Sequence, residues 1–168
     1  MNSVRQRRLL SDYDGVMALV RASDERLVVK STTGTPPDTY RLLFHCRSVV
    51  KFDDDAAIFG RDHYVRIYLP AAYPAVAPVA TMLSQVLHPH IWPNRVVCLG
   101  PWSPQEKLSS VLLRIESILI YEPGSLNWRS VADESVVPWA LRNQELLPLD
   151  MPWTSAAREN APQGQLCR

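Results

Sequence analysis

Cys98 is the residue of this sequence best placed to act as a nucleophile. It ends a proline-rich segment without regular periodicity and precedes a strongly helical pattern. A cysteine thiolate is a potent nucleophile, although most free cysteines are small buried apolar residues. Cys46 falls inside a strand pattern and Cys167 in a polar stretch, so both are interpreted as inert. Three cysteines, far apart and without a C-x-x-C pair, argue against a disulfide framework and a cysteine-rich zinc site.

Two histidines, His88 and His90, stand shortly before Cys98 and raise two other chemistries. A zinc site needs three or four ligands, and the remaining histidines, His45 and His63, lie in strand patterns without ligand spacing. We therefore expect no metal and no other cofactor. A cysteine protease with the cysteine first in the chain is excluded, because no histidine follows Cys98. The other orders lack any local motif.

Periodicity predicts the elements that must position these residues. Apolar residues at three- and four-residue steps predict a helix over 4–21. Four β-rich runs separated by turn residues follow, at 26–30, 40–50, 63–69 and 79–83. We expect loops at 31–38, which holds a glycine and two prolines, and at 53–60, which holds three aspartates and a glycine. A helix followed by a strand meander predicts an α+β fold with an antiparallel four-stranded sheet.

The second half of the chain begins with an irregular stretch, 84–104, whose prolines exclude a long helix or a central strand. It is apolar, so we expect an ordered, partly buried active-site loop. A strong helix follows: an apolar stripe runs from Leu108 to Leu119, and residues 103–106 have the pattern of a capping box with proline at the first position. A weaker helical pattern, interrupted by Pro138, covers 130–147. One domain over 1–150 and a polar, flexible tail over 151–168 are expected.

The bulk composition narrows the class of protein. The chain has 18 basic and 17 acidic residues, whereas nucleic-acid binders usually have a strongly basic face. It has neither a secretory leader pattern nor an apolar run of membrane-spanning length. We therefore expect a soluble cytoplasmic protein that acts on neither nucleic acid nor membranes.

Five motifs occur in the order that ubiquitin-conjugating enzymes show. These are Tyr-Pro-x-x-x-Pro, His-Pro-x-Ile, apolar-Cys-Leu, Trp-Ser-Pro and a helix ending in acid-Pro, at residues 73–78, 88–91, 97–99, 102–104 and 122–123. The third residue of the histidine motif, His90, stands eight positions before Cys98, as in that family. Ordered motifs are more specific together than any one alone. The chain resembles the ubiquitin-conjugating enzyme family over residues 4–147.

The resemblance implies the ubiquitin-conjugating fold and a transferase that carries a ubiquitin-like protein as a thioester on Cys98. An amine then attacks the thioester carbonyl and generates an oxyanion, for which one placed donor is worth about 3 kcal/mol. In the position of the family's asparagine this chain has His90, which would donate to the oxyanion or accept the amine's proton. Asn94 is a rival donor. For both residues a turn-stabilising hydrogen bond is the alternative interpretation.

The resemblance also implies partner surfaces. The family meets its activating enzyme on the N-terminal helix, here through Arg5, Arg7 and Arg8, although a solvated face is the alternative. The family's ligase loop corresponds to Trp102, Ser103 and Pro104, and the ring of Trp102 is interpreted as packing on the core.

Two departures from the family pattern point to a divergent member. They are His90 itself and a link from Cys98 to Trp102 that is shorter than in the common form. Both resemble bacterial relatives found in antiviral defence systems. In that setting the donor is either a ubiquitin-like modifier or the C-terminal tail of a defence nucleotidyltransferase. The competing function is a non-catalytic binding module on the same fold, against which the presence of Cys98 argues.

Overall fold

The computed structural model describes residues 3–53, 56–148 and 167. The main elements are α1 (Val4–Ala22), β1 (Leu27–Gly34), β2 (Pro37–Asp53), β3 (Ala56–Tyr68), β4 (Val79–Met82), α2 (Leu108–Leu119) and α3 (Val137–Arg142). Two short 3₁₀ turns, η1 (Pro123–Ser125) and η2 (Gln144–Leu146), flank α3. Within the tail predicted for 151–168, Cys167 alone belongs to the described residues.

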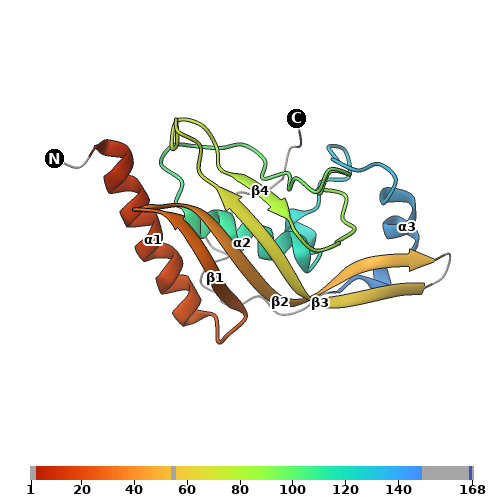
Figure 1. Ribbon diagram of the computed structural model, residues 1–168. Coiled ribbons are helices and arrows are strands. Elements are labelled where there is room, and N and C mark those ends of the chain that lie inside the picture. The colour runs from red at the N-terminus through yellow and green to blue at the C-terminus, as the bar shows by residue number, and fades with distance from the viewer. Residues whose placement is uncertain (1–2, 54–55, 149–166, 168) are drawn as a thin grey trace.

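The four strands form one antiparallel sheet in the order β1-β2-β3-β4, which confirms the predicted meander (Figure 1). On β3, Val65 and Ile67 are buried, whereas Arg66 between them is exposed. A strand places successive side chains on opposite faces, so this alternation gives the sheet one apolar face. No helix within the described ranges is both long enough and apolar enough to cross a membrane.

The strands are longer than the sequence patterns predict. The turn expected over 31–38 is confined to residues 35–36, between β1 and β2. The loop expected over 53–60 is also wrong, because β3 begins at Ala56 and includes Gly60. A Cβ on Gly60 would lie 2.7 Å from the Val50 Cγ1 atom. That glycine therefore leaves room for the Val50 side chain of the neighbouring strand and does not mark a turn.

Helix α1 begins with a capping box that the sequence analysis missed. The Ser3 hydroxyl accepts a hydrogen bond from the Gln6 N–H, and the Gln6 side chain accepts one from the Ser3 N–H. Leu9 and Val16 point from α1 into the core, as predicted. Figure 1 shows α1 beside β1 and α2 behind the sheet.

Helix α2 is capped from α1 and not by its own sequence. It begins at Leu108, and the expected capping box over 103–106 is wrong, because no side chain of that segment caps the helix. Instead, the Asp12 Oδ1 atom accepts the Leu108 N–H at 3.0 Å. The same buried carboxylate accepts hydrogen bonds from Arg8 at 2.7 Å and from the Tyr73 hydroxyl at 2.6 Å. Asp12 thus joins both helices to the segment that connects β3 and β4.

The core has two parts. The larger one fills the space between the sheet and the helices α1 and α2. A smaller one lies where α3 packs on the far end of the β2–β3 hairpin (Figure 1), around Tyr121 and Trp139. The ring of Trp139 stacks on Phe52 at 4.8 Å. Of the helical pattern predicted for 130–147, α3 forms only the middle, and Pro138 stands in its first turn, where a missing N–H costs nothing.

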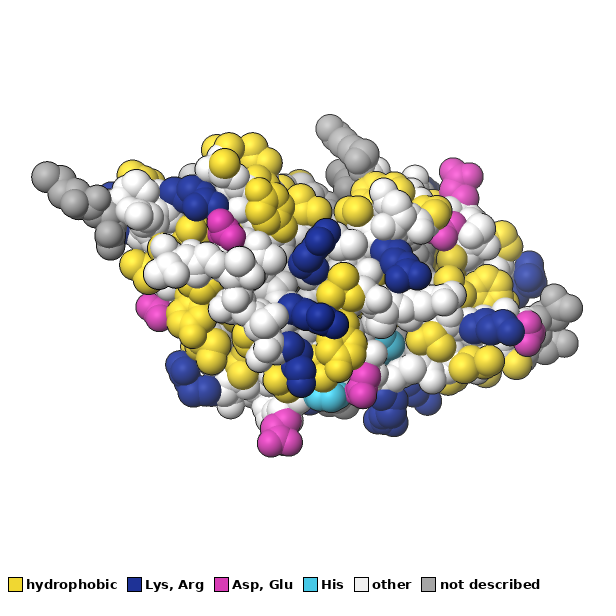
Figure 2. Space-filling view, in the orientation of Figure 1, with side chains coloured by type: hydrophobic (Ala, Val, Ile, Leu, Met, Phe, Trp, Pro, Cys, Tyr) yellow, Lys and Arg dark blue, Asp and Glu magenta, His cyan; other side chains and the backbone are white. Residues whose placement is uncertain are grey.

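The exposed face of the sheet carries basic side chains (Figure 2). Arg41 on β2 and Arg66 on β3 are register partners, and both are exposed. Because like charges directly opposite on a sheet repel, this pair does not stabilise the fold. The backbone ladders and the burial of the opposite face therefore hold the strands together.

Candidate active site

A narrow hairpin brings His90 and Cys98 together. Ile91 pairs with Val97 as an antiparallel bridge, and the Cys98 N–H donates to the His90 carbonyl at 2.8 Å. The turn closes at Arg95, whose φ of 70° lies in the left-handed region. The eight-residue spacing found in the sequence is therefore that of a hairpin in which the motif histidine and the cysteine are neighbours.

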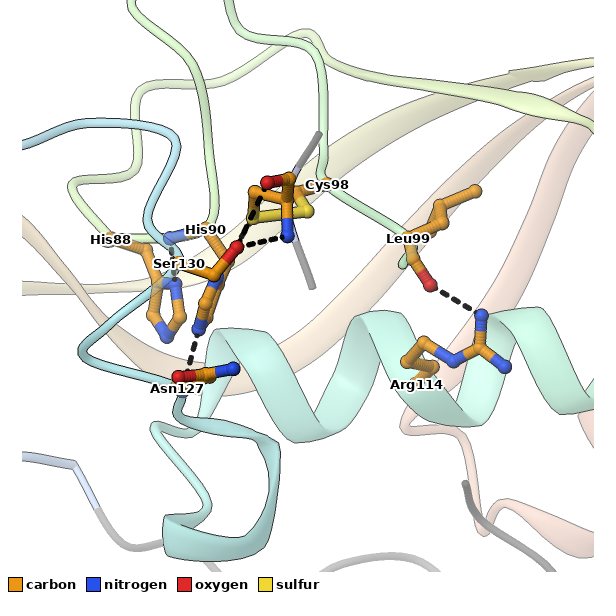
Figure 3. Close-up of a disulfide and its surroundings, with 8 residues drawn as sticks. His88, His90, Cys98, Leu99, Arg114, Asn127 and Ser130 are labelled. Carbon is orange, nitrogen blue, oxygen red and sulfur yellow. Dashed lines mark hydrogen bonds between the residues drawn. A yellow bond between two sulfur atoms is a disulfide. The ribbon is translucent and has the colours of Figure 1, made fainter. Parts of the chain in front are cut away.

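Cys98 is bonded to Cys167 in a disulfide (Figure 3). The two Cα atoms are 5.6 Å apart, which is an ordinary separation for such a bond. Cys98 is only 2% exposed, so the expectation of an accessible sulfur is wrong for this state. The expectations of no disulfide and of an inert Cys167 are wrong as well. A pair separated by 69 residues has no local spacing pattern from which to predict it.

Ser130 holds the Cys167 backbone in place. The Ser130 hydroxyl accepts the Cys167 N–H at 2.8 Å and donates to the Cys167 carbonyl at 2.8 Å. Cys167 also borders a cavity of about 490 Å³, whose other lining residues include Trp128, Glu134 and Val137. Cys167 is therefore held by its main chain as well as by its sulfur.

His90 is fully buried, and its two ring nitrogens have different roles. Nε2 accepts the backbone N–H of Asn127 at 3.0 Å, and Nδ1 lies 3.0 Å from the Cys167 Sγ atom. A backbone N–H can only donate, so Nε2 carries no proton in the neutral ring and Nδ1 carries it. Burial lowers the pKa of His90 to about 4. At neutral pH the ring is uncharged and presents an N–H donor toward the two sulfurs.

His88 holds the backbone of His90 in place. Its Nδ1 atom accepts the His90 N–H at 2.9 Å, and its ring packs at 4.3 Å from the ring of Tyr121. Burial, and then the neighbouring His90, lower the pKa of His88 well below its usual range. His88 therefore acts as a neutral structural residue that shapes the loop.

Asn94, the rival donor, makes the turn-stabilising contact considered as its alternative role. It is exposed, and its Oδ1 atom accepts the Val96 N–H at 3.1 Å. An asparagine that bonds the backbone two residues on is a common turn device. Between the two candidates, His90 is the one with a ring nitrogen close to the sulfurs.

The cluster of His90, Cys98 and Cys167 offers three metal-ligand atoms within 4.8 Å of one another. A structural zinc site takes four ligands, and its cysteines bind as thiolates. While the two sulfurs are joined, neither can serve as a thiolate. The donor set therefore does not fit a structural metal in this state.

Arg114 is a site residue that the sequence analysis missed. It donates to the Leu99 carbonyl, directly after Cys98, and to the Glu106 carboxylate. Burial raises the pKa of Glu106 and lowers that of Arg114, so the charged pair persists against a cost of desolvation. The available signal was a charged residue within the apolar stripe of α2. Arg114 thereby anchors the backbone directly after Cys98.

The predicted partner residues differ in exposure. Arg7 is exposed, whereas Arg5 donates to the Leu69 carbonyl at 3.1 Å, and Arg8 binds Asp12 with its side chain only 17% exposed. The ring of Trp102 packs on the core, as expected, and its Nε1–H donates to the Pro74 carbonyl at 2.8 Å. The rest of the ligase-loop segment, 103–104, is exposed.

Comparison with known families agrees with this geometry. The family model for the ubiquitin-conjugating enzyme matches residues 30–137, which include most of β1, the other three strands, the hairpin of His90 and Cys98, and α2. The match covers more than half of the chain, and it contains both His90 and Cys98. This chain belongs to the ubiquitin-conjugating enzyme family.

Proposed function

We propose that Cys98 carries the C-terminus of a ubiquitin-like protein, or of another protein, as a thioester and passes it to an amine. The observation that supports this most is the pairing of His90 with Cys98 across the hairpin, with an N–H donor of the ring turned toward the sulfur atoms. A nucleophile beside a preorganised donor is what acyl transfer requires.

The reaction begins from the reduced thiol. The Cys98 thiolate attacks the thioester carbonyl on an activating enzyme, and that enzyme's thiolate leaves. An amine then attacks the new carbonyl, and the Nδ1–H of His90 donates to the oxyanion. The oxyanion collapses to the amide as the C–S bond breaks and the Cys98 thiolate leaves. Since the pKa of His90 is lowered to about 4, the ring is a poor base at neutral pH. We therefore assign His90 the role of donor, and the amine's proton passes to solvent.

The partners proposed for this chemistry follow the family. An activating enzyme docks on α1, where Arg7 is the exposed member of the predicted cluster of Arg5, Arg7 and Arg8. A ligase contacts Ser103 and Pro104, which are exposed beside the core-packed Trp102. We place the reaction in the cytoplasm.

The donor is either a ubiquitin-like modifier or the C-terminal tail of a nucleotidyltransferase in an antiviral defence system. The replacement of the family's asparagine by His90 and the short link from Cys98 to Trp102 support a divergent member of that kind. Incubating the reduced protein with each donor, an activating enzyme and ATP separates the two, because only the true donor forms an adduct.

The decisive experiment follows the adduct on non-reducing gels and maps it by mass spectrometry. The reduced wild-type chain should form an adduct that thiols remove, Cys98→Ser a thiol-resistant ester, and Cys98→Ala none. An adduct that persists in Cys98→Ala, or maps to Cys46 or Cys167, contradicts the mechanism. No adduct with either donor favours a non-catalytic binding module, a reading consistent with the buried, bonded state of Cys98.

A further inference from the structure

The disulfide blocks the residue that must be a free thiolate for thioester transfer. Cys98 Sγ is bonded to Cys167, and Cys98 is 2% exposed. A sulfur in a disulfide is not a nucleophile toward an acyl group. While this bond exists, the chain cannot accept a donor.

The surroundings of Cys167 are built to hold it there. Its N–H and its carbonyl both bond the Ser130 hydroxyl at 2.8 Å, and its sulfur lies 3.0 Å from the Nδ1 atom of His90. The tautomer of His90 is set by the Asn127 N–H, so Nδ1 is a donor. A donor at this distance favours a thiolate on Cys167 once the bond is reduced. Cys167 is also more exposed than Cys98.

We propose that Cys167 is a redox gate on the active site, which caps Cys98 as a reversible disulfide when a hydroperoxide is present and releases it when a thiol reductant is present. The gating of activity rests on the transfer function proposed above, whereas the bond itself does not. The gate would also shield Cys98 from irreversible oxidation, because a sulfur in a disulfide does not proceed to sulfinic acid.

The chemistry balances with a hydroperoxide as the oxidant. The Cys167 thiolate attacks the O–O bond, becomes a sulfenic acid, and releases the alkoxide, which takes up a proton. The Cys98 thiolate then attacks the sulfenic sulfur and expels hydroxide, which leaves as water. Two thiols and ROOH give the disulfide, ROH and water. A dithiol reverses the bond by two thiol–disulfide exchanges and is itself oxidised.

The first test does not depend on activity. The full chain is reduced, exposed to hydrogen peroxide, alkylated under denaturing conditions and mapped by non-reducing peptide mass spectrometry. The expected result is a linked pair of peptides containing Cys98 and Cys167, with Cys46 alkylated. Absence of that pair, or a link from Cys98 to Cys46, overturns the gate.

The second test uses Cys167→Ser, which keeps the backbone groups that bind Ser130 but has no sulfur. Before peroxide, wild type and Cys167→Ser should load donor at the same rate. After peroxide and then dithiothreitol, wild type should recover its loading and Cys167→Ser should not, because its Cys98 has been oxidised further. Equal recovery overturns the gate. Failure of both reduced proteins to load contradicts the transfer function, while the linked peptide still tests the gate.

Ser130→Ala tests the anchor. Loss of two hydrogen bonds to the Cys167 backbone should lower the equilibrium ratio of disulfide to dithiol in a glutathione buffer by roughly tenfold. An unchanged ratio shows that the Ser130 contact does not hold the gate closed and overturns that part of the proposal.

Discussion

The backbone N–H of Asn127 donates to the Nε2 atom of His90 at 3.0 Å and so fixes the tautomer of the ring beside Cys98. The donor that faces the sulfurs is therefore set by the main chain after α2 and needs no protonation. A side chain without a ring nitrogen at position 90 loses that donor.

His90→Ala should form the Cys98 thioester at a near-normal rate yet transfer it to lysine about 100-fold more slowly, since one oxyanion donor is worth that much. Single-turnover loading and discharge, measured separately, check this. Asn94→Ala is the matched control and should leave discharge unchanged, because Asn94 bonds the Val96 N–H within its own turn. If Asn94→Ala slows discharge and His90→Ala does not, the oxyanion donor is Asn94. If His90→Ala fails to fold, His90 has a structural role.

The buried histidines should make stability fall with acidity. Burial lowers the pKa of His90 to about 4 and also lowers those of His63 and His88. Between pH 4 and 6.5 these histidines bind protons in the unfolded chain but stay neutral in the folded chain. The free energy of unfolding therefore falls as the pH drops through that window. For His90 the shift corresponds to about 3 kcal/mol. Urea titrations at pH 7 and pH 5 measure the loss, and a flat profile contradicts it.

Charge reversal on α1 should separate docking from folding. Arg7→Glu changes an exposed residue and should slow loading of Cys98 at low salt with a stability change of no more than about 0.5 kcal/mol. Arg8→Glu breaks the contact with the buried Asp12 and should lower the free energy of unfolding by about 3 kcal/mol. Loading kinetics and thermal melts of the two variants test this. Unchanged loading in Arg7→Glu would mean that this side chain is part of a solvated face and not of a docking surface.

Asp12 should be among the most sensitive polar positions of the chain. Asp12→Ala removes the cap of α2 and leaves Arg8 and the Tyr73 hydroxyl without their shared acceptor. We expect a loss of about 3–5 kcal/mol. The exposed neighbour on the same helix, Asp14→Ala, should change stability by about 0.5 kcal/mol at most. Chemical denaturation of both compares them directly, and similar midpoints contradict the structural role of Asp12.

Local sequence patterns predicted the elements whose formation depends on residues close together in the chain. The alternation in β3 and the stripe of α2 are consequences of burial on one face, and both elements formed where their patterns indicated. The ends of the strands were predicted less accurately, because β3 extends through Gly60, which pairs with Ser48 on β2. From the sequence alone, a glycine that makes room for a neighbouring strand cannot be distinguished from a glycine in a turn.

Contacts between distant segments could not be predicted in the same way. The cap of α2 comes from Asp12, and the partner of Cys98 lies 69 residues away. The family pattern predicted the positions of His90 and Cys98, since their spacing is that of a hairpin. It contained no information on Ser130 or Asn127, whose contributions pass through a hydroxyl and a backbone amide at positions outside any motif.

The division of the core into two parts has a consequence for how the molecule opens. The smaller part, around Tyr121 and Trp139, rests on the far end of the β2–β3 hairpin, whereas α2 lies in the larger part. Regions with separate apolar contacts can unfold as separate cooperative units. Amide hydrogen exchange should therefore be faster, and concerted, in the hairpin end and α3 than in α2. The far end of the β2–β3 hairpin and α3 can open locally while the hydrogen bond between Cys98 and His90 remains formed.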